Sequence, residues 1–151
     1  MAAEDAARVL ILSAEIDQKF GDFAAAGRAY RALRGLLARA AASPALAPIE
    51  AEAASGLGEL RRAQGRYAEA EGIYLEALRK ARRRLGAQHE STWGLMNGLG
   101  MLYKYTGRFA RAARLYRAGL ARASAALGPE HPALATLHHN LGGLEHARGR
   151  H

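Results

Sequence analysis

The chain has 151 residues, enough for one domain with its own core, and its hydrophobic half is rich in alanine and leucine with only 7% aromatic residues, which is a helical composition. It contains no cysteine, which excludes disulfides, thiolate metal sites and a thiol nucleophile. No segment approaches the roughly 18 apolar residues of a transmembrane helix, and the N-terminus lacks the basic and apolar regions of a signal peptide. We therefore expect an all-α protein without a membrane segment, located in the cytoplasm.

The net charge of +8 is unevenly distributed. Residues 1–60 carry six basic and eight acidic side chains, whereas residues 61–151 carry sixteen basic and six acidic ones, with the densest basic run at residues 79–84. A basic region of this kind occurs in proteins that bind nucleic acid or another acidic surface. Cations at the end of a helix also complement the helix dipole, so a purely structural reason is available. Nucleic-acid binding is therefore kept only as the alternative function.

Helical periodicity of apolar residues predicts seven helices. The prolines in Ser43-Pro44 and Ala47-Pro48 are expected to break the chain between the second and third helices. The predicted ranges are about 4–20, 23–41, 49–64, 67–85, 90–106, 109–127 and 132–148.

A glycine-containing motif recurs between these helices. Gly65-Arg66-Tyr67 and Gly107-Arg108-Phe109 are 42 residues apart, a looser copy at residues 21–23 lies 44 residues earlier, and residues 149–151 begin a further copy. Glycine adopts the left-handed conformation that ends a helix, so each motif predicts a tight turn between two antiparallel helices. Repeated helical hairpins with a period in this range predict an α-solenoid.

Each predicted hairpin also repeats a glycine within its first helix and aromatic residues in its second. Gly58, Gly100 and Gly142 stand at equivalent mid-helix positions, where glycine costs about 1 kcal/mol relative to alanine. This repeated cost predicts a close approach of two helix backbones. The aromatic pairs, seven residues apart on one helical face, predict core packing: Phe23 with Tyr30, Tyr67 with Tyr74, and Phe109 with Tyr116.

Together these residues resemble the tetratricopeptide repeat family, and the 42-residue period resembles its kinesin-light-chain type. The resemblance implies one domain over residues 1–151, with repeats at about 4–47, 49–90 and 91–132 and a terminal half repeat at 133–151. It also implies a right-handed superhelix whose concave groove binds an extended peptide or partner protein, without catalysis. The expected function is thus a protein–protein interaction scaffold.

The resemblance also implies which side chains line the groove, namely residues around the mid-helix glycine of each first helix. An asparagine amide there pairs with both the N–H and the C=O of an extended peptide, and a lysine beside an aromatic ring suits an acidic ligand. For each asparagine, a merely solvated side chain is an equally open interpretation. The candidate peptide-binding residues are Glu59, Arg62, Asn97, Met101, Lys104, Tyr105, His139 and Asn140.

No pattern of catalytic groups, phosphate-binding loop or cofactor motif is present, so we expect neither enzyme activity nor a cofactor. Five histidines occur late in the chain, at positions 131, 138, 139, 146 and 151, but their spacing is not that of a zinc site. His89 and His131 occupy equivalent loop positions and are expected to serve the turn.

Leu141, Leu144 and Ala147 continue the apolar pattern of the last helix. Either this helix caps the array with only its inner face apolar, or its outer edge docks on a second copy. We therefore expect a monomer or an end-to-end homodimer.

Overall fold

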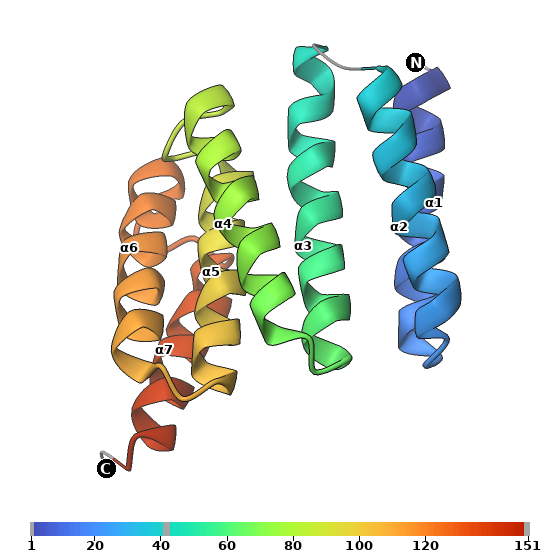
Figure 1. The fold of residues 1–151 in the computed structure, drawn as a ribbon. Helices are drawn as coiled ribbons and strands as arrows, with labels where there is room; N and C mark the ends of the chain where they lie inside the picture. Colours follow the sequence, from blue (N-terminus) through green and yellow to red (C-terminus); the bar gives the residue numbers. More distant parts are fainter. Residues whose placement is uncertain (1, 41–42, 150–151) are drawn as a thin grey trace. The chain divides into compact units, whose positions relative to one another are not determined.

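The structure, a computed structural model, describes residues 2–40 and 43–149 (Figure 1). These residues form seven α-helices and one short 3-10 helix, without strands in the described part. The elements are α1 (Ala2–Lys19), α2 (Phe23–Arg39), η1 (Pro44–Leu46), α3 (Ala47–Ala63), α4 (Tyr67–Arg84), α5 (Glu90–Tyr105), α6 (Phe109–Leu127) and α7 (Leu134–Ala147). The chain is an all-α solenoid of antiparallel hairpins, as the periodicity predicted.

Two compact units divide the chain, Met1–Ala77 and Leu78–His151, and we describe each by itself. Unit 1 contains α1, α2, η1, α3 and the first part of α4, while unit 2 contains the remainder of α4 and α5 to α7. The single domain expected over residues 1–151 stays a prediction. Position 41 of the predicted second helix and the end of the last glycine motif lie outside the described residues.

The linker between α2 and α3 differs from the prediction. Pro44 begins the 3-10 turn η1, and α3 already starts at Ala47, two residues earlier than expected. Pro48 therefore does not break the helix but lies in its first turn. Proline is well tolerated there, because the first N–H groups of a helix have no intrahelical acceptor and the proline ring fixes a helical φ.

The glycine turns within the hairpins have the predicted geometry. Gly65 has φ +74° and Gly107 has φ +78°, both in the left-handed region. At the first turn the N–H of Gly65 donates to the carbonyl of Arg62 at 2.9 Å, and the next N–H, of Arg66, reaches back to Arg61 at 2.8 Å. This Schellman pattern, which recurs at residues 21 and 107, satisfies carbonyls that the end of the helix leaves without a partner.

The core of unit 1 joins α1, α2 and α3. Small and branched side chains of α1 meet Tyr30 and Leu33 of α2 and Leu57 and Leu60 of α3 in one buried cluster. In Figure 1, α1 and α2 form an antiparallel pair. The inward face of α1 consists of Ala7, Ile11 and Ala14.

Unit 2 packs α7 against the hairpin of α5 and α6. Leu134 and Leu137 of α7 lie in one cluster with Ala123 of α6, and Trp93 and Leu120 cover its edge. Trp93 is half-buried on this cluster. Leu144 is also fully buried.

The mid-helix glycines contact an aromatic ring and not a second backbone, which corrects the prediction. A Cβ added to Gly58 would lie 2.6 Å from the ring of Tyr74, and one added to Gly100 would lie 2.6 Å from the ring of Tyr116. Glycine is thus needed because the tyrosine of the second helix occupies the place of a side chain. A Cβ added to Gly142, by contrast, would have no neighbouring atom within 4 Å among the described residues.

Only one aromatic of each predicted core pair is fully buried. Tyr30, Tyr74 and Tyr116 are at most 2% exposed. Their partners Phe23 and Phe109 are half-buried and Tyr67 is exposed, because they stand in the first turn of each second helix, at the edge of the core.

Candidate functional site

Six of the eight predicted binding residues lie in unit 2, on α5 and α7. Asn97, Met101 and Lys104 follow one another at helical spacing on α5, and all three are half-buried. His139 and Asn140 are adjacent on α7, the first exposed and the second half-buried, and Tyr105 is exposed at the end of α5.

The two asparagines meet across the helices. Asn140 donates from Nδ2 to Oδ1 of Asn97 at 2.7 Å, and they are the only asparagines in the chain. This bond uses one donor of Asn140 and one acceptor site of Asn97. The amide of Asn97 keeps its Nδ2 donors and that of Asn140 keeps its Oδ1 acceptor, so the pair still offers both kinds of group.

Lys104 reaches from α5 toward the same part of α7. Its Nζ would lie 3.4 Å from a Cβ added to Gly143, three residues beyond Asn140. Within the described residues, no acidic side chain forms an ion pair with this ammonium group. The ammonium group therefore lies against the backbone of α7 close to the asparagine pair.

More positive charge lies at the turn that follows α5. The guanidinium groups of Arg108 and Arg111 lie 5.3 Å and 5.8 Å from the centre of the Tyr103 ring, within the range of a cation–π contact. The carboxyl end of α5 therefore carries several cations close together in sequence, which favours an acidic ligand over a basic one.

The remaining two predicted residues, Glu59 and Arg62, lie on α3 in unit 1. Glu59 is exposed and Arg62 is half-buried. Their part in one common groove with the residues of α5 and α7 stays a prediction.

The histidines at the loop positions serve the turns, as the sequence suggested. His89 accepts a hydrogen bond at Nδ1 from the N–H of Ser91 at 3.0 Å, and His131 accepts one from Ala133 at 3.1 Å. These bonds hold the starts of α5 and α7. Among the described residues, no group of three or more histidine and acidic side chains is placed to hold a metal ion, and His151 lies outside that part of the chain.

One surface feature was missed by the sequence analysis. Val9, Leu12 and Ile16 of α1 and Phe20, directly after its end, form an exposed apolar row, here called the α1 strip. Their spacing of three or four residues was visible in the sequence, but it does not reveal which of two apolar faces lacks a neighbour. None of the helices in residues 2–40 and 43–149 combines the length and apolar character needed to cross a bilayer.

Comparison with known proteins identifies the family. The sequence profile of the tetratricopeptide repeat matches residues 49–125 and 94–151, more than half of the chain. The chain therefore belongs to the tetratricopeptide repeat family. A search among curated proteins finds no significant match.

Solved structures agree with this assignment. The chain superposes on BtubC (BKLC) from P. vanneervenii with a TM-score of 0.77 at 25% identity, over 95% of this chain and 57% of that one. It superposes on a putative kinesin light chain with nearly identical TPR-like repeats from Podosopora anserina with a TM-score of 0.79 at 21% identity, over 95% of this chain and 67% of that one. A single-substitution variant of the latter protein gives the same score and identity.

This chain spans little more than half of the P. vanneervenii protein. The fold is that of a protein-interaction scaffold, because tetratricopeptide repeats generally mediate contacts with protein partners.

Proposed function

We propose that unit 2 binds an extended segment of a partner protein across α5 and α7, on the side of Asn97 and Asn140. The observation that carries this proposal is the hydrogen bond between the two asparagines, 2.7 Å long. It fixes two amides side by side while leaving a donor on Asn97 and an acceptor on Asn140. An extended peptide presents a C=O and an N–H at matching spacing, which such a pair captures independently of the peptide's sequence.

The ammonium group of Lys104 favours peptides that carry an acidic group. Lys104 lies over Gly143 next to the asparagine pair, and Tyr105 follows it at the exposed end of α5. An acidic side chain or a terminal carboxylate of the ligand would reach this ammonium group. The preferred ligand is thus an extended peptide with a carboxylate beside the stretch held by the asparagines.

The role is proposed to be non-catalytic, since the site consists of amides, a lysine and aromatic groups without a positioned nucleophile and base. Binding without chemistry is also the usual role of tetratricopeptide repeats. A cytoplasmic location remains part of this proposal.

The sharpest variant is Asn97→Asp. It keeps the Oδ1 acceptor that receives the Asn140 bond, so the cross-helix contact and the fold are retained, but it removes the Nδ2 donor. Peptides selected from a random display library on the native chain should bind this variant about tenfold or more weakly, because one peptide carbonyl loses its partner. Lys104→Met should weaken the binding of acidic peptides and leave the binding of other peptides unchanged. The control variant, Arg114→Ala with Arg122→Ala on exposed positions of α6, should bind like the native chain.

Nuclear magnetic resonance provides a direct readout. The chain has only two asparagines, and the variants Asn97→Asp and Asn140→Asp assign their side-chain amide signals among those of the glutamines. Both signals should shift when peptide is added. Unchanged signals with undiminished affinity would place the ligand elsewhere. Affinity that falls steeply with salt and is lost after nuclease treatment would instead identify nucleic acid bound at the basic surface.

A further inference from the structure

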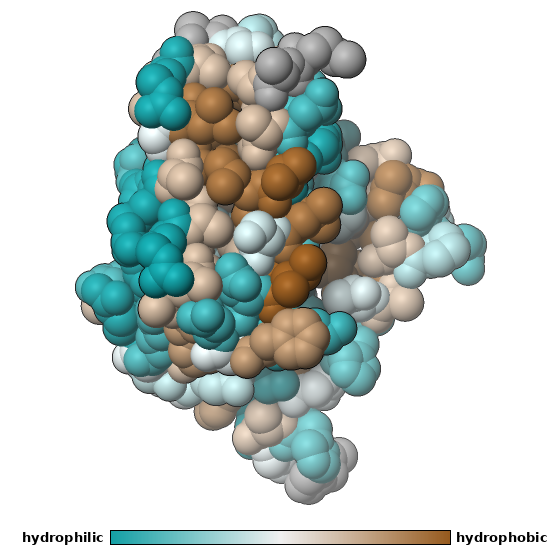
Figure 2. Space-filling model, turned by 90° about the vertical axis from the view of Figure 1, so that its right-hand side faces the viewer, coloured by the Kyte–Doolittle hydropathy of each residue, from teal (hydrophilic) through white to brown (hydrophobic). Residues whose placement is uncertain are grey.

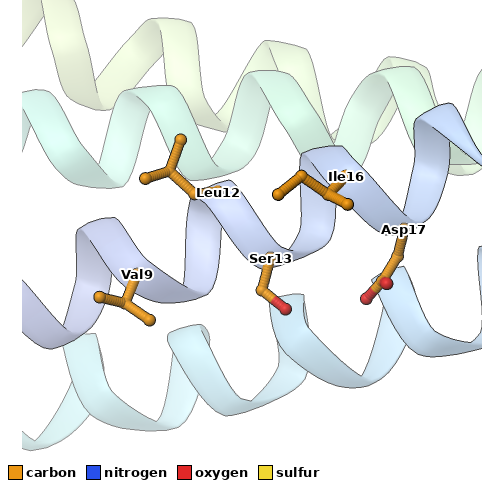
Figure 3. Close-up of a pocket in the computed structure, with 5 residues that line it drawn as sticks. All are labelled: Val9, Leu12, Ser13, Ile16 and Asp17. Carbon is orange, nitrogen blue, oxygen red and sulfur yellow. The ribbon is translucent and has the colours of Figure 1, made fainter.

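The α1 strip is a large apolar surface on a helix that is otherwise well packed. Val9 is 64% exposed, Leu12 57%, Ile16 55% and Phe20 81%. Figure 2 shows a column of apolar side chains on the face of the molecule formed by this region. Figure 3 shows Val9, Leu12 and Ile16 on α1, where together with Ser13 and Asp17 they line an open hollow.

The positions equivalent to Val9 and Ile16 in the other first helices are buried. Counting from the glycine turn, Ile16 corresponds to Leu60 of α3, Leu102 of α5 and Leu144 of α7, each at most 1% exposed. The position of Val9 corresponds likewise to buried residues at 53, 95 and 137. Val9 and Ile16 therefore occupy positions that contact a neighbouring helix in other repeats, whereas the positions equivalent to Leu12 and Phe20 are not part of the core there.

In α3 and α7 this face packs on helices. Leu60 belongs to the cluster that contains residues of α1 and α2, and Leu137 belongs to the cluster that contains residues of α5 and α6. The surface complementary to such a face is thus a helix with an apolar row of its own. The α1 strip is itself such a row.

The charges beside the strip specify how two copies of α1 would pair. Glu4, Arg8, Glu15 and Lys19 stand at intervals of four, seven and four residues, so they share one edge of the helix next to the strip. Along the helix their signs alternate: negative, positive, negative, positive. Arg8 contacts Glu4 of its own helix at 3.3 Å, an exposed pair that a second copy can still reach.

An antiparallel pair brings these four residues together in pairs of opposite charge. Glu4 then lies across from Lys19 of the second copy, and Arg8 lies across from Glu15 of the second copy, with both contacts repeated by the two-fold symmetry. In a parallel pair, related by a two-fold axis along the helices, the charged edges of the two copies lie on opposite sides and make no such contacts. Charge complementarity therefore favours the antiparallel arrangement.

We propose that the α1 strip is a self-association surface through which two copies of this chain form a symmetric antiparallel dimer. In the register that pairs these charges, Val9, Leu12 and Ile16 of each copy lie around the two-fold axis, which is a small contact compared with a standard stable interface. The dimer is accordingly weak and forms in the micromolar range or above. This places a homodimer contact on α1, where the sequence suggested the last helix.

The test is sedimentation velocity of the full chain from low micromolar to near-millimolar concentration. The native chain should pass from monomer to dimer. Ile16→Glu should raise the dissociation constant about tenfold or more, because a carboxylate would have to be buried in the strip. Thr136→Glu, on an exposed position of α7, should leave it unchanged. Circular dichroism verifies that both variants keep their helices, which is expected since both positions are exposed.

A charge exchange tests the orientation. Arg8→Glu alone should weaken the dimer, and Arg8→Glu combined with Glu15→Arg should restore it, because the exchanged charges again attract across the antiparallel pair. The proposal is overturned if the native chain stays monomeric over the whole range, which would leave the strip to a helix of another protein. It is also overturned if the double variant dimerises no better than Arg8→Glu.

Discussion

The helices α1 and α7 expose different kinds of side chain. Val9, Leu12 and Ile16 of α1, together with Phe20 directly after it, are exposed and apolar. On α7 the leucines Leu134, Leu137 and Leu144 are buried, while His138, His139 and His146 are exposed. A polar exposed face is well solvated, whereas an exposed apolar row gains free energy when another apolar surface covers it.

Shortening a side chain at equivalent positions of α1 and α7 should give the largest difference in the free energy of unfolding. Leu144→Ala should lower the free energy of unfolding by about 2–5 kcal/mol, because Leu144 is 0% exposed and its removal leaves a cavity. Ile16→Ala, at the corresponding position of α1, should cost less than about 1 kcal/mol in dilute protein. Urea unfolding followed by circular dichroism and by the fluorescence of Trp93, the single tryptophan, measures both. Equal losses would contradict the difference in burial.

The mid-helix glycines of α5 and α7 should respond differently to substitution by alanine. Gly100→Ala should destabilise the protein by about 1–3 kcal/mol, because the new methyl group would overlap the buried ring of Tyr116. Gly142→Ala should stabilise it by up to about 1 kcal/mol, because that position is helical and nothing lies within 4 Å of the added carbon in the described residues. Thermal unfolding of the two variants measures whether each change raises or lowers the stability. A loss at Gly142 as large as that at Gly100 would mean that a second helix packs there.

Alkaline pH should act on both units, because Tyr30 and Tyr74 are buried in unit 1 and Tyr116 is buried in unit 2. Burial raises the pKa of Tyr30 in unit 1 to about 12, with smaller contributions from nearby carboxylates, and burial raises the pKa of Tyr116 in unit 2 to about 12. Unfolded tyrosine loses its proton near pH 10, so stability is fully present below about pH 10 and is lost as the pH rises toward about 12.

At about pH 11 each of these tyrosines should have cost about 1.4 kcal/mol of stability. Urea midpoints measured across this pH range test the expectation. Tyr116→Phe is the control, since Tyr116 Oη has no hydrogen-bond partner among the described residues. The variant should keep its stability at neutral pH and show a shallower alkaline decrease. An unchanged decrease would assign the effect to other groups.

The smallest expected effect concerns the start of α7. His131→Ala should cost about 0.5 kcal/mol, because the Nδ1 atom that accepts the N–H of Ala133 is lost. His131→Asn offers an acceptor of similar reach and should recover most of the loss. Hydrogen exchange of the first amides of α7 measures this change. No change in either variant would show that the bond contributes little in solution.

The hairpins were predictable from the sequence because their turns depend on local geometry. A glycine with positive φ at positions 65 and 107 ends one helix and allows the next to begin two residues later, and the 42-residue period repeats this arrangement. The η1 turn and the early start of α3 were missed, because a proline such as Pro48 suits the first turn of a helix as well as a break before it.

The candidate site was predictable only residue by residue. The sequence suggested Asn97 and Asn140 separately, but their hydrogen bond depends on how α5 and α7 lie beside each other, and the two residues are 43 positions apart where the repeat period is 42. The ring that faces Gly100 was unpredictable for the same reason: the sequence shows that a side chain is missing, not which atom fills the space.

The glycine turns also determine how the chain assembles. Only three residues separate α1 from α2, and likewise α5 from α6, so each hairpin forms its contacts between segments that are close in sequence. Such contacts close with little loss of chain entropy, and proteins rich in them fold quickly. During synthesis a hairpin can therefore pair as soon as its second helix has left the ribosome, without waiting for the next repeat.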